Sequence, residues 1–99
     1  GSACGWPDLV TSNTITYNSA NITWNAVVSA TSYDLRWKPS SGSTWTNVTG
    51  LATNSCGLGG LSPLTGYDAQ VRSVCAGGTL RPSTAVCGFT LHSAPLLAP

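Results

Sequence analysis

The chain has 99 residues, a formal net charge of +1 and only 7% charged residues. This length allows one domain, and 41% hydrophobic residues are enough for a modest packed core. The four lysine and arginine residues do not cluster, which excludes the basic footprint of a nucleic-acid-binding protein.

Short strands are the elements expected along the chain. Runs rich in valine, isoleucine, threonine, tyrosine and tryptophan alternate with turn residues at intervals of about 8–12 residues, which is typical of an all-β sandwich or barrel. No stretch shows the helical spacing of apolar residues over three turns. In chain order, the expected strands are 9–17, 21–24, 32–38, 44–48, 55–61, 67–75 and 84–91. A loop is expected from residue 76 to Pro82.

The strands expected at 32–38 and 67–75 show the clearest alternation of apolar and polar residues. A period of two indicates that one face of each strand is buried and the other is solvated. We therefore expect the charged residues of both strands on an outer face. The expected core residues are Trp24, Tyr33, Leu35, Trp37, Leu61, Tyr67, Val71 and Phe89.

The spacing of these aromatic and apolar residues resembles a fibronectin type III domain. The resemblance is carried by Trp24, by Tyr33-x-Leu35-x-Trp37, and by Leu58-x-x-Leu61-x-Pro63-x-Thr65-x-Tyr67-x-Ala69-x-Val71. It covers roughly residues 6–91 and implies an all-β fold, the seven-stranded immunoglobulin-like antiparallel β-sandwich. It also implies that Tyr67 forms a tyrosine corner, with its hydroxyl on an upstream backbone group. In such a fold the strands at 32–38 and 67–75 are neighbours, so their outward charges would lie side by side.

The two ends of the resemblance indicate a more specific variant. The opening Cys4-Gly5-Trp6-Pro7 and the pair Val74-Cys75 are similar to the cysteine-containing domains found in secreted multidomain proteins of Bacteroidota-like bacteria. This similarity implies a bacterial protein that is secreted or held at the cell surface.

The chain has four widely spaced cysteines: Cys4, Cys56, Cys75 and Cys87. None of them forms a CxxC or CxxH motif, which argues against a zinc site. An even number of cysteines in a short chain favours two disulfides and an oxidising compartment. Three pairings are open. The resemblance favours Cys4–Cys75 together with Cys56–Cys87, and the competing pairing is Cys75–Cys87 with Cys4–Cys56.

The expected domain is residues 1–92, followed by a linker or docking tail at 93–99 that is apolar and bounded by proline. No catalytic site is expected, because the single histidine, His92, falls at a strand end and the three aspartates are scattered. No apolar run approaches the ~20 residues of a membrane span. We expect no enzyme, cofactor or metal.

Three residues are candidates for ligand contact. Trp6 and Trp45 are the tryptophans with the weakest core pattern, and Arg81 is the one charge in its loop. The preferred function is a non-catalytic secreted or cell-surface interaction or spacer module, in adhesion or an extracellular assembly. Its partners would be neighbouring domains, copies of itself, or a protein or polysaccharide ligand. The alternative is a carbohydrate-binding accessory domain of a secreted polysaccharide-degrading enzyme, in which tryptophan stacks on sugar rings.

Overall fold

The computed structural model describes residues 5–78, 80–82 and 86–95, without the side chains of 80–82. Eight strand segments and one 3₁₀ turn follow one another along the chain. They are β1 (Thr11–Asn13), β2 (Ala20–Thr23), β3 (Ala30–Pro39), β4 (Thr46–Leu51), β5 (Ser55–Leu58), β6 (Gly66–Cys75), η1 (Ala76–Gly78), β7 (Leu80–Pro82) and β8 (Cys87–Thr90).

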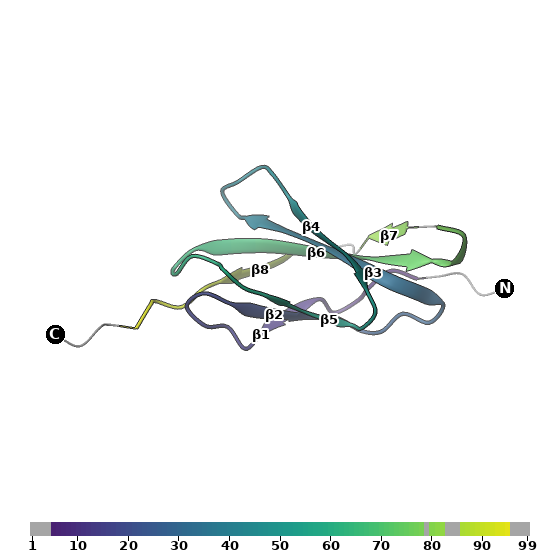
Figure 1. Cartoon of the computed structure of the whole chain (residues 1–99), viewed down its shortest axis with the longest axis horizontal. Coiled ribbons are helices and arrows are strands. Elements are labelled where there is room, and N and C mark those ends of the chain that lie inside the picture. Colours follow the sequence, from purple (N-terminus) through teal and green to yellow (C-terminus); the bar gives the residue numbers. More distant parts are fainter. Residues whose placement is uncertain (1–4, 79, 83–85, 96–99) are drawn as a thin grey trace.

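The strands form two antiparallel sheets packed face to face (Figure 1). One sheet has the order β1–β2–β5, and the other has the order β4–β3–β6–β7, with β8 also paired to β6. Because β7 and β8 pair with successive stretches of β6, they are two parts of a single edge strand. The fold is therefore a seven-stranded sandwich of three and four strands, which confirms the predicted fold class.

Two strand boundaries differ from the prediction for local reasons. The expected strand 9–17 is reduced to β1 because Leu9 and Thr14, on either side, have φ angles of 52° and 50°. This left-handed backbone is incompatible with a strand. The expected loop after residue 75 contains β7, which the sequence analysis missed. Gly77 and Gly78, with φ angles of 84° and 83°, turn the chain back so that β7 pairs with β6.

The core lies between the sheets and receives side chains from both. Of the expected core residues, the structure buries Trp24, Tyr33, Leu35, Leu61, Tyr67, Val71 and Phe89, while Trp37 is partly buried against them. The aromatic rings form two edge-to-face pairs, with centroids 5.4 Å apart for Trp24–Tyr33 and 5.8 Å for Trp37–Tyr67. This geometry suits the charge distribution of aromatic rings.

The backbone N–H of Ser62 donates a hydrogen bond of 2.9 Å to the hydroxyl of Tyr67. This is the tyrosine corner that the sequence predicts, and it fixes the connection between β5 and β6 at the point where the chain changes sheets.

The chain enters at one end of the sandwich and leaves at the other (Figure 1). At the entry end, the peptide at Asp8 lies against the loop that follows β2, since Asn25 N–H donates to the Asp8 carbonyl at 2.9 Å. At the exit end, His92 N–H donates to the Thr16 carbonyl at 3.0 Å. The ten residues of β6 separate these two ends by about 30 Å.

Candidate functional site

The outer face of the β4–β3–β6 sheet holds five of the seven charged residues of the chain. The strand period of two places alternate side chains of β3 and β6 on this face, and the antiparallel register aligns them in rows. One row pairs Asp34 with Arg72, the next aligns Asn47, Arg36 and Gln70, and the third pairs Lys38 with Asp68. We call these seven residues the charged face.

Two rows of the charged face are closed by ion pairs. Arg72 Nε donates to Asp34 Oδ2 at 2.9 Å, and Lys38 Nζ lies 3.3 Å from Asp68 Oδ2. Asp34 also accepts the N–H of Gly50 at 3.2 Å, and Asp68 accepts the hydroxyl of Ser40 at 2.9 Å. Both carboxylates are thus held by partners on neighbouring strands, as the outward pattern of the sequence predicts.

The middle row leaves one positive charge without a carboxylate partner among the described residues. Arg36 donates from Nε and Nη2 to Oε1 of Gln70, at 3.0 and 2.5 Å. Its guanidinium carbon lies 4.2 Å from the ring centroid of Trp45, and Lys38 Nζ lies 5.2 Å from the same ring. An amide oxygen and an aromatic ring stabilise a cation without neutralising it. The net charge of +1 on this face therefore resides at Arg36.

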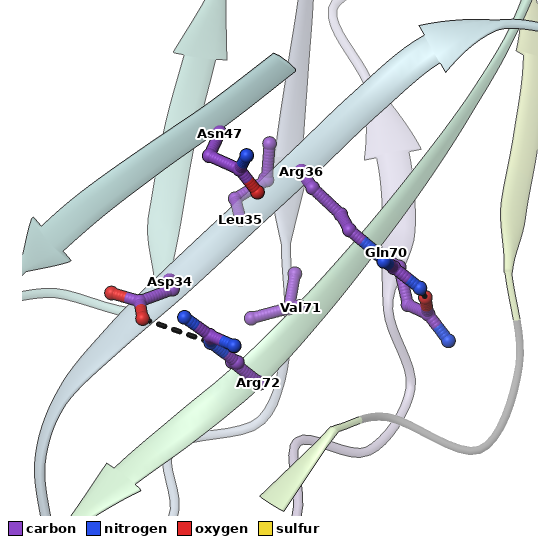
Figure 2. Close-up of a pocket in the computed structure, with 7 residues that line it drawn as sticks. All are labelled: Asp34, Leu35, Arg36, Asn47, Gln70, Val71 and Arg72. Atoms are coloured by element: carbon purple, nitrogen blue, oxygen red, sulfur yellow. Dashed lines mark hydrogen bonds and ion pairs between the residues drawn. The ribbon is translucent and has the colours of Figure 1, made fainter. Parts of the chain in front are cut away.

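A shallow hollow of about 380 Å³ lies in the middle of the charged face. Figure 2 shows Asp34 and Arg72 joined across β3 and β6, with Arg36 extending toward Gln70 beside them. The lining residues are Asp34, Leu35, Arg36, Asn47, Gln70, Val71 and Arg72. The hollow thus combines cationic, anionic and amide side chains, whereas Leu35 and Val71 are buried in the core beneath the sheet. This set of polar groups suits contact with a polar ligand.

The outer face of the β1–β2–β5 sheet has a different chemistry. These three strands contain no charged residue. Thr11 Oγ1 and Thr23 Oγ1 are 3.2 Å apart, and the side chain of Asn13 donates to Thr23 at 3.1 Å and accepts from Asn21 at 3.1 Å. We call this the uncharged face, because its side chains satisfy one another through neutral hydrogen bonds.

The structure does not bring the three candidate ligand residues together. Trp45 lies before β4, partly buried beneath the two cations of the charged face. Trp6 is 53% exposed and lies at the entry end, next to Pro7 and Asp8. Arg81 is in β7, but its side chain lies outside the description. Sequence reasoning named neither Gln70 nor Asn47 as a candidate contact residue. The signal for both was the outward parity that they share with the charges.

The expected Cys56–Cys87 disulfide is wrong, because both residues are free thiols. Cys87 is hydrogen-bonded to Ser12 of β1, at one edge of the β1–β2–β5 sheet. Cys56 lies on β5, at the opposite edge of this sheet, where it aligns with Ile22 of β2. Strands are about 4.8 Å apart, so two strand spacings exceed the roughly 7 Å that a disulfide allows between Cα atoms. Burial raises the pKa of both thiols.

The competing pairing, which joins Cys75 to Cys87, is likewise ruled out by the free Cys87. Cys75 is disulfide-bonded. Cys4 lies outside the described residues, and its pairing with Cys75 stays a prediction.

The described part of the chain contains no group of three or more histidine, cysteine, aspartate or glutamate side chains arranged to hold a metal ion. His92 is exposed just beyond β8, at the exit end. No helix within the described residues is long and apolar enough to cross a membrane.

The two sheets and the tyrosine corner define an immunoglobulin-like β-sandwich. The family model for the fibronectin type III domain matches residues 6–88, and the chain belongs to this family. The residues that carried the resemblance in the sequence therefore identified the family correctly. The narrower assignment to a cysteine-containing bacterial variant stays a prediction.

Solved structures with the same fold come from varied sources. A Fn3-like protein from Clostridium thermocellum is 25% identical with a TM-score of 0.74, over 98% of this chain and 100% of that one. A protein called FN3tt is 18% identical with a TM-score of 0.76, over 95% and 100%. The FN1–FN3 domains of chicken CNTN1 are 17% identical with a TM-score of 0.77, over 88% of this chain and 32% of that one. No curated protein sequence matches the chain significantly.

Proposed function

We propose that this chain is a non-catalytic module of a secreted or cell-surface protein, and that it contacts a polar protein partner through the charged face. Fibronectin type III domains are typically interaction or spacer modules in multidomain proteins, and they commonly flank other domains in long chains. The family therefore supports a module of this kind, and the charged face supports the place of contact.

One observation carries the proposal: five of the seven charges lie on one outer face and three of them line a single hollow, while the strands of the opposite face carry none. A chain with so few charges needs no such concentration for solubility, because its short polar side chains already cover the surface. Grouped charges instead give orientation and specificity to an encounter with a complementary surface.

The extracellular location rests on the cysteines and the surface composition. We propose that Cys4 is the partner of Cys75, since the other two cysteines are free thiols. A bridge of this kind persists in an oxidising compartment. Residues 93–99 remain a proposed linker or docking tail, of which 93–95 are described and exposed.

Carbohydrate binding is the second candidate, and two features favour it: the amides of Asn47 and Gln70 in the hollow, and the Trp45 ring in contact with Arg36. Sugars bind to planar polar side chains and stack on aromatic rings. The cations of Arg36 and Lys38 cover one face of the Trp45 ring, so stacking requires the other face or a shift of both side chains.

A capture experiment with the immobilised domain tests the two candidate functions. The probes are extracellular protein from the source cells and a panel of purified neutral and acidic polysaccharides. We expect protein capture that is lost in Arg36→Gln and Trp45→Ala and retained in the opposite-face control Thr23→Ala. Capture that all three variants retain would overturn the assignment to the charged face. Polysaccharide binding lost only in Trp45→Ala would establish the second candidate instead.

A further inference from the structure

Arg36 is exposed at the centre of the charged face, but its guanidinium is held in place on two sides. Its Nε and Nη2 both donate to Oε1 of Gln70, which occupies one edge of the planar group. The Trp45 ring covers one of its two faces, with the guanidinium carbon 4.2 Å from the ring centroid. An arginine held in this way has already lost much of the side-chain freedom that binding would otherwise remove.

The edge of the guanidinium formed by Nη1 and Nη2 offers two further donors. A guanidinium carries five N–H donors in a fixed plane, and Gln70 accepts from two of them. One N–H on Nη1 and one on Nη2 point in the same direction, and we call this pair of donors the Arg36 fork. Two parallel donors match the two oxygens of a carboxylate in a bidentate pair. Within the described part of the chain, no carboxylate forms an ion pair with Arg36, since Asp34 and Asp68 bond to other cations.

The rows on either side of the Arg36 fork favour a ligand with a single negative charge. Both rows are neutral ion pairs, and successive outward residues of a strand lie roughly 7 Å apart. One carboxylate gains the attraction of Arg36, whereas a polyanion would also bring negative charges next to Asp34 and Asp68. The exposed amide of Asn47 lies beside Arg36 in the same row, and it can bond to a neutral polar group next to the carboxylate.

We propose that the Arg36 fork binds one aspartate or glutamate side chain of the protein partner, presented among neutral polar residues. This inference rests on the proposed function and deepens it, because it names the group that the charged face recognises. Figure 2 shows Arg36 and Gln70 apart from the joined Asp34 and Arg72. The partner carboxylate neutralises this middle row, as the two aspartates of the charged face neutralise the rows beside it. An acidic polysaccharide fits less well, because its carboxylates repeat along the polymer.

A random peptide library displayed on phage tests the proposal, with the immobilised domain as bait. Peptides that require the charged face are those that bind the opposite-face control Thr23→Ala but not Trp45→Ala. We expect these peptides to share one aspartate or glutamate at a fixed position. Replacing that acid by its amide should weaken binding to the unmodified domain about tenfold, because a hydrogen bond to a charged group is lost.

A double-mutant cycle tests whether Arg36 itself receives the peptide carboxylate. In Arg36→Gln, the change from acid to amide in the peptide should weaken binding less than about twofold, because the fork is absent. Arg36→Lys keeps the charge without the fork, so its preference for the acid should fall to about threefold or less. Arg72→Gln removes a cation of the neighbouring row and should keep the preference, whatever its effect on the affinity. Both Arg36 variants should melt within about 4 °C of the unmodified domain, which excludes a folding defect.

The outcomes separate this inference from the proposed function. Peptides that require the charged face but bind equally well as acid and amide would overturn the carboxylate assignment and leave the proposed function intact, as would an unchanged preference in Arg36→Gln. A library that yields no peptide dependent on the charged face would also overturn the inference, and the capture experiment would still decide the proposed function. Polygalacturonate, a polymer of acidic sugars, is the last probe. Tighter binding of this polymer than of any peptide, lost in Arg36→Gln, would assign the Arg36 fork to an acidic polysaccharide instead.

Discussion

The two outer faces of this sandwich differ more than its two inner faces do. The charged face has long side chains tied by ion pairs around a hollow, and the uncharged face has threonine and asparagine side chains joined by neutral hydrogen bonds. Both sheets direct apolar side chains to the same core. Architecture is therefore shared between the sheets, whereas the chemistry available to a partner is concentrated on one of them.

The difference between the two outer faces distinguishes residues that the fold requires from residues that only a ligand would require. A strand requires only that alternate residues be apolar, so its outward positions are free to vary. Short neutral side chains on the uncharged face satisfy that requirement without offering a distinctive surface. Fixed ion pairs across β3 and β6 exceed the requirement, since ion pairs at a solvated surface contribute little to stability even when they are partly buried. The contrast supports a binding role for the charged face.

The largest expected effect tests whether the two sheets share one core. Leu35 of β3 is 1% exposed and Ile22 of β2 is 0% exposed. Leu35→Ala and Ile22→Ala should each lower the free energy of unfolding by about 2–5 kcal/mol, because both remove buried methyl groups and leave a cavity. Urea denaturation measures the loss. A small loss for one residue alone would show that the sheets do not share the core equally.

A smaller change in the free energy of unfolding, this time an increase, is expected at Ser73, the only buried polar residue among the described residues. Ser73 on β6 is 0% exposed, and its hydroxyl has no hydrogen-bond partner within the described part of the chain. Ser73→Ala should raise the free energy of unfolding by about 1 kcal/mol, because it removes an unsatisfied polar group. The matched control is Ala69→Ser on the same strand, which should lower it. Destabilisation by Ser73→Ala would reveal a bound water or an unrecognised partner.

Features that repeat along the chain could be predicted from the sequence. The alternation around Leu35 and Val71 is read directly from strand geometry, because a period of two assigns each residue to a face. The outward charges of these strands were expected to lie side by side because the family resemblance makes the two strands neighbours, and Asp34 meets Arg72 there at 2.9 Å. The tyrosine corner at Tyr67 was also predictable, since it depends on a local run of residues.

Features that depend on one backbone angle or on distant partners could not be predicted. Nothing in the residue types near Leu9 or Leu64 indicates a left-handed conformation, because leucine disfavours it. The pairing of Cys56 and Cys87 failed because the resemblance does not specify which edge of a sheet each of these two residues occupies. The hollow required the register of three strands, which alternation within single strands does not supply.

The electrostatic contrast between the faces predicts a difference in salt dependence. Asp34→Asn removes the charge that holds Arg72, and it should lower the free energy of unfolding by about 1 kcal/mol or less. The loss should shrink at 0.5 M NaCl, where the Debye length falls to roughly 4 Å. Asn13→Ala on the uncharged face breaks neutral bonds to Thr23 and Asn21, so its loss should not change with salt. Urea titrations at both salt concentrations measure this. Equal salt dependence would contradict the contrast.

The smallest effect concerns the free thiols, one on each sheet. Burial raises the pKa of Cys56 above that of an ordinary thiol, and it raises the pKa of Cys87 despite opposing hydrogen bonds from Ser12. A raised folded-state pKa means that the unfolded chain loses its thiol protons first, so stability is retained below pH 9 and declines as the pH rises above it. Native alkylation at pH 8 should be slow and slower at the more buried Cys56, because the thiolate is the reactive form.

Unfolding the chain without a reductant sharpens this prediction. Mass spectrometry should then find two alkylated cysteines, Cys56 and Cys87, and should find four after reduction. Alkylation of no cysteine before reduction would establish a second bridge and contradict the two free thiols. Alkylation of all four would contradict the bridge at Cys75 and remove the disulfide support for an extracellular location. The number of modified cysteines thus tests the proposed compartment independently of the charged face, because a module kept in a reducing compartment would retain four thiols whatever it binds.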